Sequence, residues 1–130
     1  DEWMLECSRT SGTDEFVRMH PAGYDMPLGE RGAGLSGGQR QSVGIARALI
    51  NNSDIKMFDE PTNAMDQTSE SIVLNNLMSK IEGKTLLLVT QKMSMVDLVD
   101  RIIVMNFGTK VLDGPKDEII NKLGNSGEKQ

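Results

Sequence analysis

Seven consecutive residues, about a quarter of the way along the chain, have the types and spacing of an anion-binding site. They are Leu35, Ser36, Gly37, Gly38, Gln39, Arg40 and Gln41. Ser36 fits a helix N-cap, and the glutamine three residues later completes a capping box. A helix start offers unpaired backbone N–H groups and the positive end of a dipole, and the two glycines would let a phosphate approach that backbone closely. The alternative is an ordinary capped helix whose glycines only form a turn.

Two adjacent acids form a second candidate site. Asp59 and Glu60 directly follow the apolar run Ile55 to Phe58, which predicts a strand. Ligands of open α/β sheets bind at the carboxyl ends of strands. Asp59 could hold Mg²⁺, directly or through a water, because Mg²⁺ prefers hard oxygen ligands. Glu60 could orient and polarise the water that attacks a phosphate. Alternatively, the two acids only cap the following helix. Lys56 interrupts the run and is expected either to snorkel or to face solvent at a sheet margin.

The seven-residue motif is the signature of the ATP-binding cassette (ABC) family, which the chain resembles from about Asp14 to Leu123. The resemblance implies ATP and Mg²⁺ as cofactors of the complete domain, with Leu35 to Gln39 contacting the nucleotide. It makes Asp59 and Glu60 the Walker B acids. It also makes Asp66 the aspartate of the D-loop, which crosses a dimer interface between two nucleotide-binding domains. Asp66 is equally well placed to N-cap a helix that begins at Gln67.

Gln91 departs from the family pattern. It follows the predicted strand Thr85 to Val89, where the family has a switch histidine, and the only histidine of the chain is His20. Glutamine donates and accepts hydrogen bonds but carries no positive charge at physiological pH. We therefore expect Gln91 to sit at the catalytic position with weakened hydrolysis, either naturally or as a mutation. A naturally non-hydrolysing site is the alternative.

The loop before the signature is similar to that of ABC exporters. Gly29 to Gly32 resembles the exporter loop that contacts the transmembrane domain. Together with Gly23 to Asp25, Leu98 to Arg101 and Gly114 to Asp117, it resembles exporters of type I protein secretion. The resemblance implies several partners: a second nucleotide-binding domain in a homodimer, the transmembrane domain, a membrane-fusion protein and an outer-membrane channel. It also implies a location at the cytoplasmic face of a bacterial inner membrane.

A phosphate-binding loop is not found among the 130 residues. Gly83-Lys84-Thr85 resembles the end of a G-x-x-x-x-G-K-[ST] motif, but position 78 is methionine instead of the required glycine. The chain therefore resembles a C-terminal fragment of the domain without Walker A, and we expect these residues alone neither to bind ATP tightly nor to hydrolyse it. A degenerate, non-hydrolysing ABC domain that acts as a binding or regulatory module is the alternative. A chromosome-maintenance ATPase is disfavoured by the Gly29 to Gly32 loop and by the acidic balance.

The alternation of predicted strands and helices indicates an α/β protein with a parallel sheet. Helices are expected at Glu2–Ser8, Asp14–His20 (capped by Thr13), from the signature to about Asn51, Gln67–Ile81, Ser94–Val99, and from Gly114-Pro115 to about Leu123. Strands are expected at Ile55–Phe58, Thr85–Val89, Arg101–Met105 and Lys110–Leu112. The expected fold is a partial ABC-ATPase, P-loop NTPase-like, with a mainly parallel sheet flanked by helices. Residues 1–52 would be part of the helical signature subdomain, and residues 53–130 the C-terminal half of the RecA-like core.

Composition narrows the function classes. With 19 acidic and 14 basic residues interspersed, the net charge is −5, which speaks against a nucleic-acid partner. The sequence has no run of about 18 apolar residues that would cross a bilayer. A single cysteine, Cys7, excludes an internal disulfide.

Overall fold

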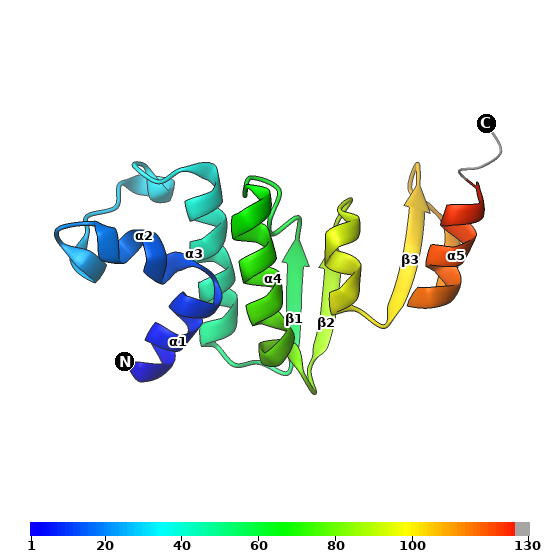
Figure 1. The fold of residues 1–130 in the computed structure, drawn as a ribbon, viewed down its shortest axis with the longest axis horizontal. Helices are drawn as coiled ribbons and strands as arrows, with labels where there is room; N and C mark the ends of the chain where they lie inside the picture. Colours follow the sequence, from blue (N-terminus) through cyan, green and yellow to red (C-terminus); the bar gives the residue numbers. More distant parts are fainter. Residues whose placement is uncertain (127–130) are drawn as a thin grey trace. The chain divides into compact units, whose positions relative to one another are not determined.

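The computed structural model describes residues 1–126 and divides the chain into two compact units, Asp1–Gln91 and Lys92–Gln130 (Figure 1). The first unit contains α1 (Glu2–Thr10), α2 (Thr13–Met19), α3 (Gly37–Ile50), α4 (Gln67–Ile81), the strands β1 (Ile55–Asp59) and β2 (Thr85–Val89), and the 3-10 turns η1 (Gly23–Asp25) and η2 (Glu30–Gly32). The second contains η3 (Met93–Leu98), β3 (Arg101–Asn106), β4 (Thr109–Pro115) and α5 (Lys116–Ser126). The predicted division after residue 52 stays a prediction.

The strands form two separate pairs. β1 and β2 are parallel, with Asp59 opposite Val89 at their carboxyl ends. This register brings the segment after β1 and the segment after β2 to one edge of the sheet. β3 and β4 form an antiparallel hairpin, whose tip requires positive φ at Phe107 (46°) and Gly108 (75°). The α/β class and the parallel sheet are thus confirmed.

The core of the first unit lies between α3, α4 and the inner face of β1. Its buried apolar side chains include Ile45 and Leu49 of α3, Val73 and Leu77 of α4, and Phe58 of β1. These residues recur at helical spacing on α3 and α4, so each helix buries one stripe. α1 contacts both α3 and α4. In Figure 1, α3 and α4 run next to each other, and both helices begin at the same end.

The prediction that Lys56 snorkels or faces solvent is wrong. Lys56 is only 2% exposed, and its Nζ donates to the carbonyl of Ala48 in the last turn of α3 at 2.6 Å. Along β1 the burial alternates so that Lys56 and Phe58 point inward while Ile55 and Met57 are 62% and 69% exposed. The carbonyls of the last helical turn have no partner within the helix, and a lysine near them is favourable. A tertiary contact with α3 therefore draws the charged residue inside.

Two predicted helix starts also differ from the structure. The N-cap of α2 is Gly12, with φ of 77°, and Thr13 is already the first helical residue. A left-handed backbone at this position favours glycine over threonine. Gly114 and Pro115 belong to the end of β4, and α5 begins at Lys116.

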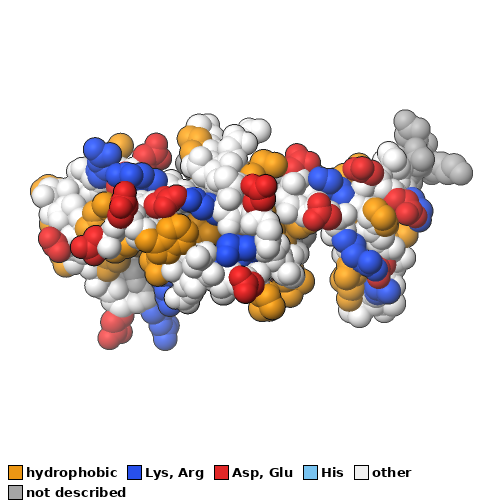
Figure 2. Space-filling view, turned by 90° about the horizontal axis from the view of Figure 1, so that it is seen from below, with side chains coloured by type: hydrophobic (Ala, Val, Ile, Leu, Met, Phe, Trp, Pro, Cys, Tyr) orange, Lys and Arg blue, Asp and Glu red, His pale blue; other side chains and the backbone are white. Residues whose placement is uncertain are grey.

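Acidic and basic side chains are interspersed on the face drawn in Figure 2. Among residues 1–126, no helix has the length and hydropathy needed to cross a membrane.

Candidate functional site

The signature residues form the start of α3, as predicted. The Ser36 hydroxyl accepts from the Gln39 amide at 3.1 Å, and the Gln39 side chain accepts from the Ser36 amide at 2.9 Å. This reciprocal pair confirms the capping box. The N–H groups of Gly37 and Gly38 lie in the first helical turn, where an α-helix supplies no internal acceptor. These two N–H groups are therefore the donors through which the start of α3 could bind an anion.

The two glycines also have a packing role that the sequence did not reveal. A Cβ atom built on Gly37 would lie 3.0 Å from the Cβ of Ala64, and one on Gly38 would lie 3.0 Å from the Ala64 carbonyl oxygen. Contacts this short require a neighbour to move. The start of α3 and the loop before α4 therefore touch backbone to backbone, and larger side chains at Gly37 or Gly38 would separate them.

The predicted Walker B acids lie at the carboxyl end of β1. Asp59 is exposed as its last residue, and Glu60 follows with a positive φ of 44°. The Glu60 amide donates to the Val89 carbonyl at 2.8 Å, and the Thr90 hydroxyl lies 3.4 Å from the Glu60 carboxylate. Gln91, which is exposed, comes next after Thr90. The structure thus brings Glu60 and the end of β2 to the same edge of the sheet.

Asp66 caps α4. Its carboxylate accepts from the Ser69 amide at 3.0 Å and from the Ser69 hydroxyl at 2.7 Å. These hydrogen bonds, the backbone one first, hold the pKa of Asp66 below its usual value. The capping role expected from the sequence is confirmed, and it keeps the carboxylate ionised.

Metal-binding capacity rests on few carboxylates. Within residues 1–126, no three His, Cys, Asp or Glu side chains gather as a potential metal cluster. Mg²⁺ is commonly held by one or two carboxylates together with waters and substrate phosphates. Asp59, exposed at the strand end and adjacent to Glu60, fits that kind of site.

Gln41 is a site residue that had no separate role in the sequence analysis. Its side-chain Nε2 donates to the Glu60 carbonyl at 3.1 Å, and its Oε1 accepts from the Ala64 amide at 2.8 Å. Gln41 lies one helical turn after Gly37, on the side of α3 that meets Ala64. The spacing from Gly37 indicates which side of α3 Gln41 occupies. It does not indicate the partners of Gln41, which come from a different part of the chain.

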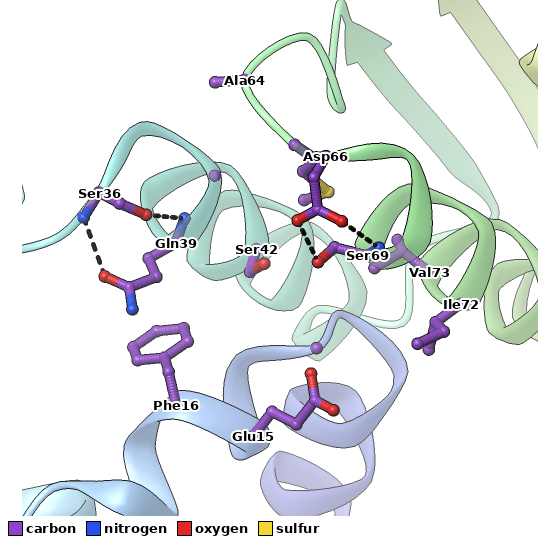
Figure 3. A pocket seen from close by; sticks show the side chains of 13 residues that line it. Glu15, Phe16, Ser36, Gln39, Ser42, Ala64, Asp66, Ser69, Ile72 and Val73 are labelled. Carbon is purple, nitrogen blue, oxygen red and sulfur yellow. Dashed lines mark hydrogen bonds between the residues drawn. The ribbon is translucent and has the colours of Figure 1, made fainter.

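A pocket of about 270 Å³ opens between α2, the start of α3 and the start of α4 (Figure 3). Its polar lining includes the two caps, Ser36 with Gln39 and Asp66 with Ser69, together with Glu15 and Ser42. Phe16 and Val73 are among its apolar lining residues. The pocket therefore joins the signature, the predicted D-loop and α2 in one concave surface. Glu60 and Gln91 do not line it.

Comparison with known proteins gives consistent results. A family model described as "ABC transporter" matches residues 10–63. The leukotoxin translocation ATP-binding protein LktB of a Pasteurella haemolytica-like species (strain 5943B) is 42% identical over 119 residues, and LktB of Mannheimia haemolytica is equally similar. These alignments cover 92% of this chain and 17% of the relatives, so the chain spans about a sixth of their length.

A solved structure has the same fold. A bacterial Atm1-family ABC exporter with ATP bound superposes with a TM-score of 0.80 and 30% identity, covering 91% of this chain and 21% of the exporter chain. The fold and the signature site are those of part of a cassette-type ATP-binding domain. The chain belongs to the ABC transporter family, and its relatives here are translocation ATP-binding proteins and an exporter.

Proposed function

We propose that these residues form the signature-bearing part of an ATP-binding and ATP-hydrolysing domain of an ABC exporter for type I protein secretion. The observation that carries the proposal is the joining of three elements in one unit: the strand-end acid Glu60, the signature helix start and the loop Asn63–Asp66. Gln41 and the close Gly38–Ala64 approach connect them. The 42% identity to leukotoxin translocation ATP-binding proteins supports the secretion class.

Each site residue has a proposed role. Leu35 to Gln39 contact the phosphates of ATP held by a second nucleotide-binding domain, and Asp66 lies at the interface with that domain. Asp59 holds Mg²⁺, which supplies charge neutralisation at the phosphates when bound. Glu60 accepts a proton from the attacking water, and Gln91 orients that water by hydrogen bonding.

The proposed partners follow from the exporter class. η2, which includes Glu30 and Arg31 as exposed charges, contacts the transmembrane domain of the same exporter. Arg31 adopts φ of 57° and Gly32 φ of 73°, so this turn presents its charges on a tightly folded backbone. The other proposed partners are a second nucleotide-binding domain, in a homodimer, and a membrane-fusion protein. The proposed location is the cytoplasmic face of a bacterial inner membrane.

The 130 residues contain no phosphate-binding lysine motif. We therefore propose that they do not hydrolyse ATP alone. The test compares three samples: the full-length protein, its Glu60→Gln variant and the 130-residue chain. Glu82→Gln, which alters an exposed acid after α4, is the matched control.

The full-length protein is expected to hydrolyse ATP in a Mg²⁺-dependent manner, and Glu60→Gln to lower the rate roughly 100-fold. Glu82→Gln should match wild type, and the 130 residues should show no turnover. A full-length protein that neither binds nor hydrolyses ATP would refute the proposal. Robust ATP turnover by the 130-residue chain would refute the proposal that these residues do not hydrolyse ATP alone.

Gln91 in place of a histidine favours one other function, a regulatory ABC domain that binds nucleotide without hydrolysing it. The same experiment separates the two. Tight ATP binding by the full-length protein with no hydrolysis, even in a Gln91→His variant, would favour the regulatory module.

A further inference from the structure

Glu60 has an unusual backbone for a glutamate. Its φ of 44° lies in the left-handed region, which costs a non-glycine residue energy because Cβ crowds the following carbonyl oxygen. Such residues persist when surrounding groups over-determine them, and they concentrate at functional sites. The groups that contact the Glu60 backbone must therefore stabilise its left-handed conformation.

Both polar groups of the Glu60 backbone are held. The amide donates to the Val89 carbonyl at 2.8 Å, which continues the β1–β2 ladder by one residue. The carbonyl accepts from Gln41 Nε2 at 3.1 Å. The first bond belongs to the sheet, whereas the second comes from a side chain of α3. The Glu60 carbonyl also accepts from the Asn63 amide, at the longer distance of 3.4 Å.

The orientation of the Gln41 amide is fixed by its partners. One partner, the Glu60 carbonyl, is an acceptor, and the other, the Ala64 amide, is a donor. A flipped amide would place Oε1 against the carbonyl and Nε2 against the N–H, so both bonds would be lost. Gln41 is half-buried, which limits competition from water.

We propose that Gln41 is a positioning residue for ATP hydrolysis: it holds Glu60 in its left-handed conformation and ties the loop containing Ala64 to the signature helix. One side chain thereby connects the phosphate-facing helix start, the general base and the interface loop. The inference rests on the proposed function, since Glu60 acts as the base there.

Two substitutions in the full-length protein separate the two bonds. Gln41→Met has a similar length and removes both. Gln41→Glu keeps an acceptor for the Ala64 amide but cannot donate to the Glu60 carbonyl. The control is Asn75→Leu, a comparable loss of an amide on an exposed position of α4.

Steady-state ATP hydrolysis is the first measurement. Both Gln41 variants lack the bond to the Glu60 carbonyl and should therefore lower kcat roughly five- to tenfold, as expected for loss of that one hydrogen bond, while KM and the affinity for ATP stay within about twofold. Asn75→Leu should match wild type. A kcat within about twofold of wild type for Gln41→Met, or a parallel fall in kcat and ATP affinity, would overturn the inference.

Amide hydrogen exchange gives a second measurement that does not depend on turnover. Exchange in a peptide covering residues 58–66 should be roughly five- to tenfold faster in Gln41→Met than in wild type, and unchanged in Asn75→Leu. Unchanged exchange in Gln41→Met would refute the positioning role. Failure of the wild type to bind or hydrolyse ATP would instead refute the proposed function, so the two failures are distinguishable.

Discussion

The packing role of Gly38 can be tested against a glycine of the same helix. Gly38 and Gly44 both lie in α3, but only Gly38 meets a neighbour: a Cβ there would lie 3.0 Å from the Ala64 carbonyl oxygen, whereas one on Gly44 would meet nothing within 4 Å. The substitutions Gly38→Ala and Gly44→Ala therefore add the same methyl group to one helix in two environments.

The expected effects have opposite signs. Alanine in a helix is favoured over glycine by about 0.5–1 kcal/mol, so Gly44→Ala should stabilise the protein by that amount. Gly38→Ala has a smaller propensity gain in the first turn and adds an overpacking cost of about 1–3 kcal/mol. We expect a net loss of about 0–2 kcal/mol, and thus a difference of about 1–3 kcal/mol between the variants.

Urea unfolding of the 130-residue chain, followed by fluorescence, measures this difference. Trp3 is the only tryptophan, and its Nε1 donates to the Ile50 carbonyl at 2.9 Å, so it reports on the packing of α1 against α3. If Gly38→Ala stabilised the chain as much as Gly44→Ala, the backbone contact between α3 and Ala64 would be refuted.

Three further predictions concern charge and catalysis. Burial first, and repulsion from Lys84 second, lower the pKa of Lys56. The unfolded chain therefore binds the Lys56 proton more tightly than the folded chain does. The free energy of unfolding of wild type, measured with urea, should rise relative to that of Lys56→Met as pH increases toward about 10. The pKa of Asp66 is lowered by its Ser69 hydrogen bonds. Any excess in the free energy of unfolding of wild type over that of Asp66→Asn should therefore be present above pH about 4 and be lost below it in the same assay. An excess that persisted at acid pH would contradict the charge-based reasoning. In the full-length protein, Gln91→His should raise the ATPase rate, and an unchanged rate would show that Gln91 does not limit hydrolysis.

Features determined by neighbouring residues were predictable from the sequence. The capping box of Ser36 and Gln39, the Asp66 cap, and the helix Gln67–Ile81 all depend on positions within four residues of one another. The strand Thr85–Val89 was equally accessible because it is a short apolar run bounded by turn residues.

Features that depend on tertiary contacts were not predictable. Lys56 was expected at the solvent, since charged residues are rarely buried. In the structure Lys56 is buried, because the face of β1 that carries it is the one that packs toward α3, and the apolar Ile55 and Met57 are exposed instead. Gln41 was overlooked for the same reason: its partners, Glu60 and Ala64, lie 19 and 23 residues away.

The contacts of Gln41 restrict how the site can move. If the start of α3 shifted relative to β1, the Gln41 amide would either lose its bond to the Glu60 carbonyl or carry that carbonyl with it. The Gly38–Ala64 approach applies the same restriction to the loop before α4. A displacement of the helix start would therefore reach the Glu60 backbone through one side chain, Gln41.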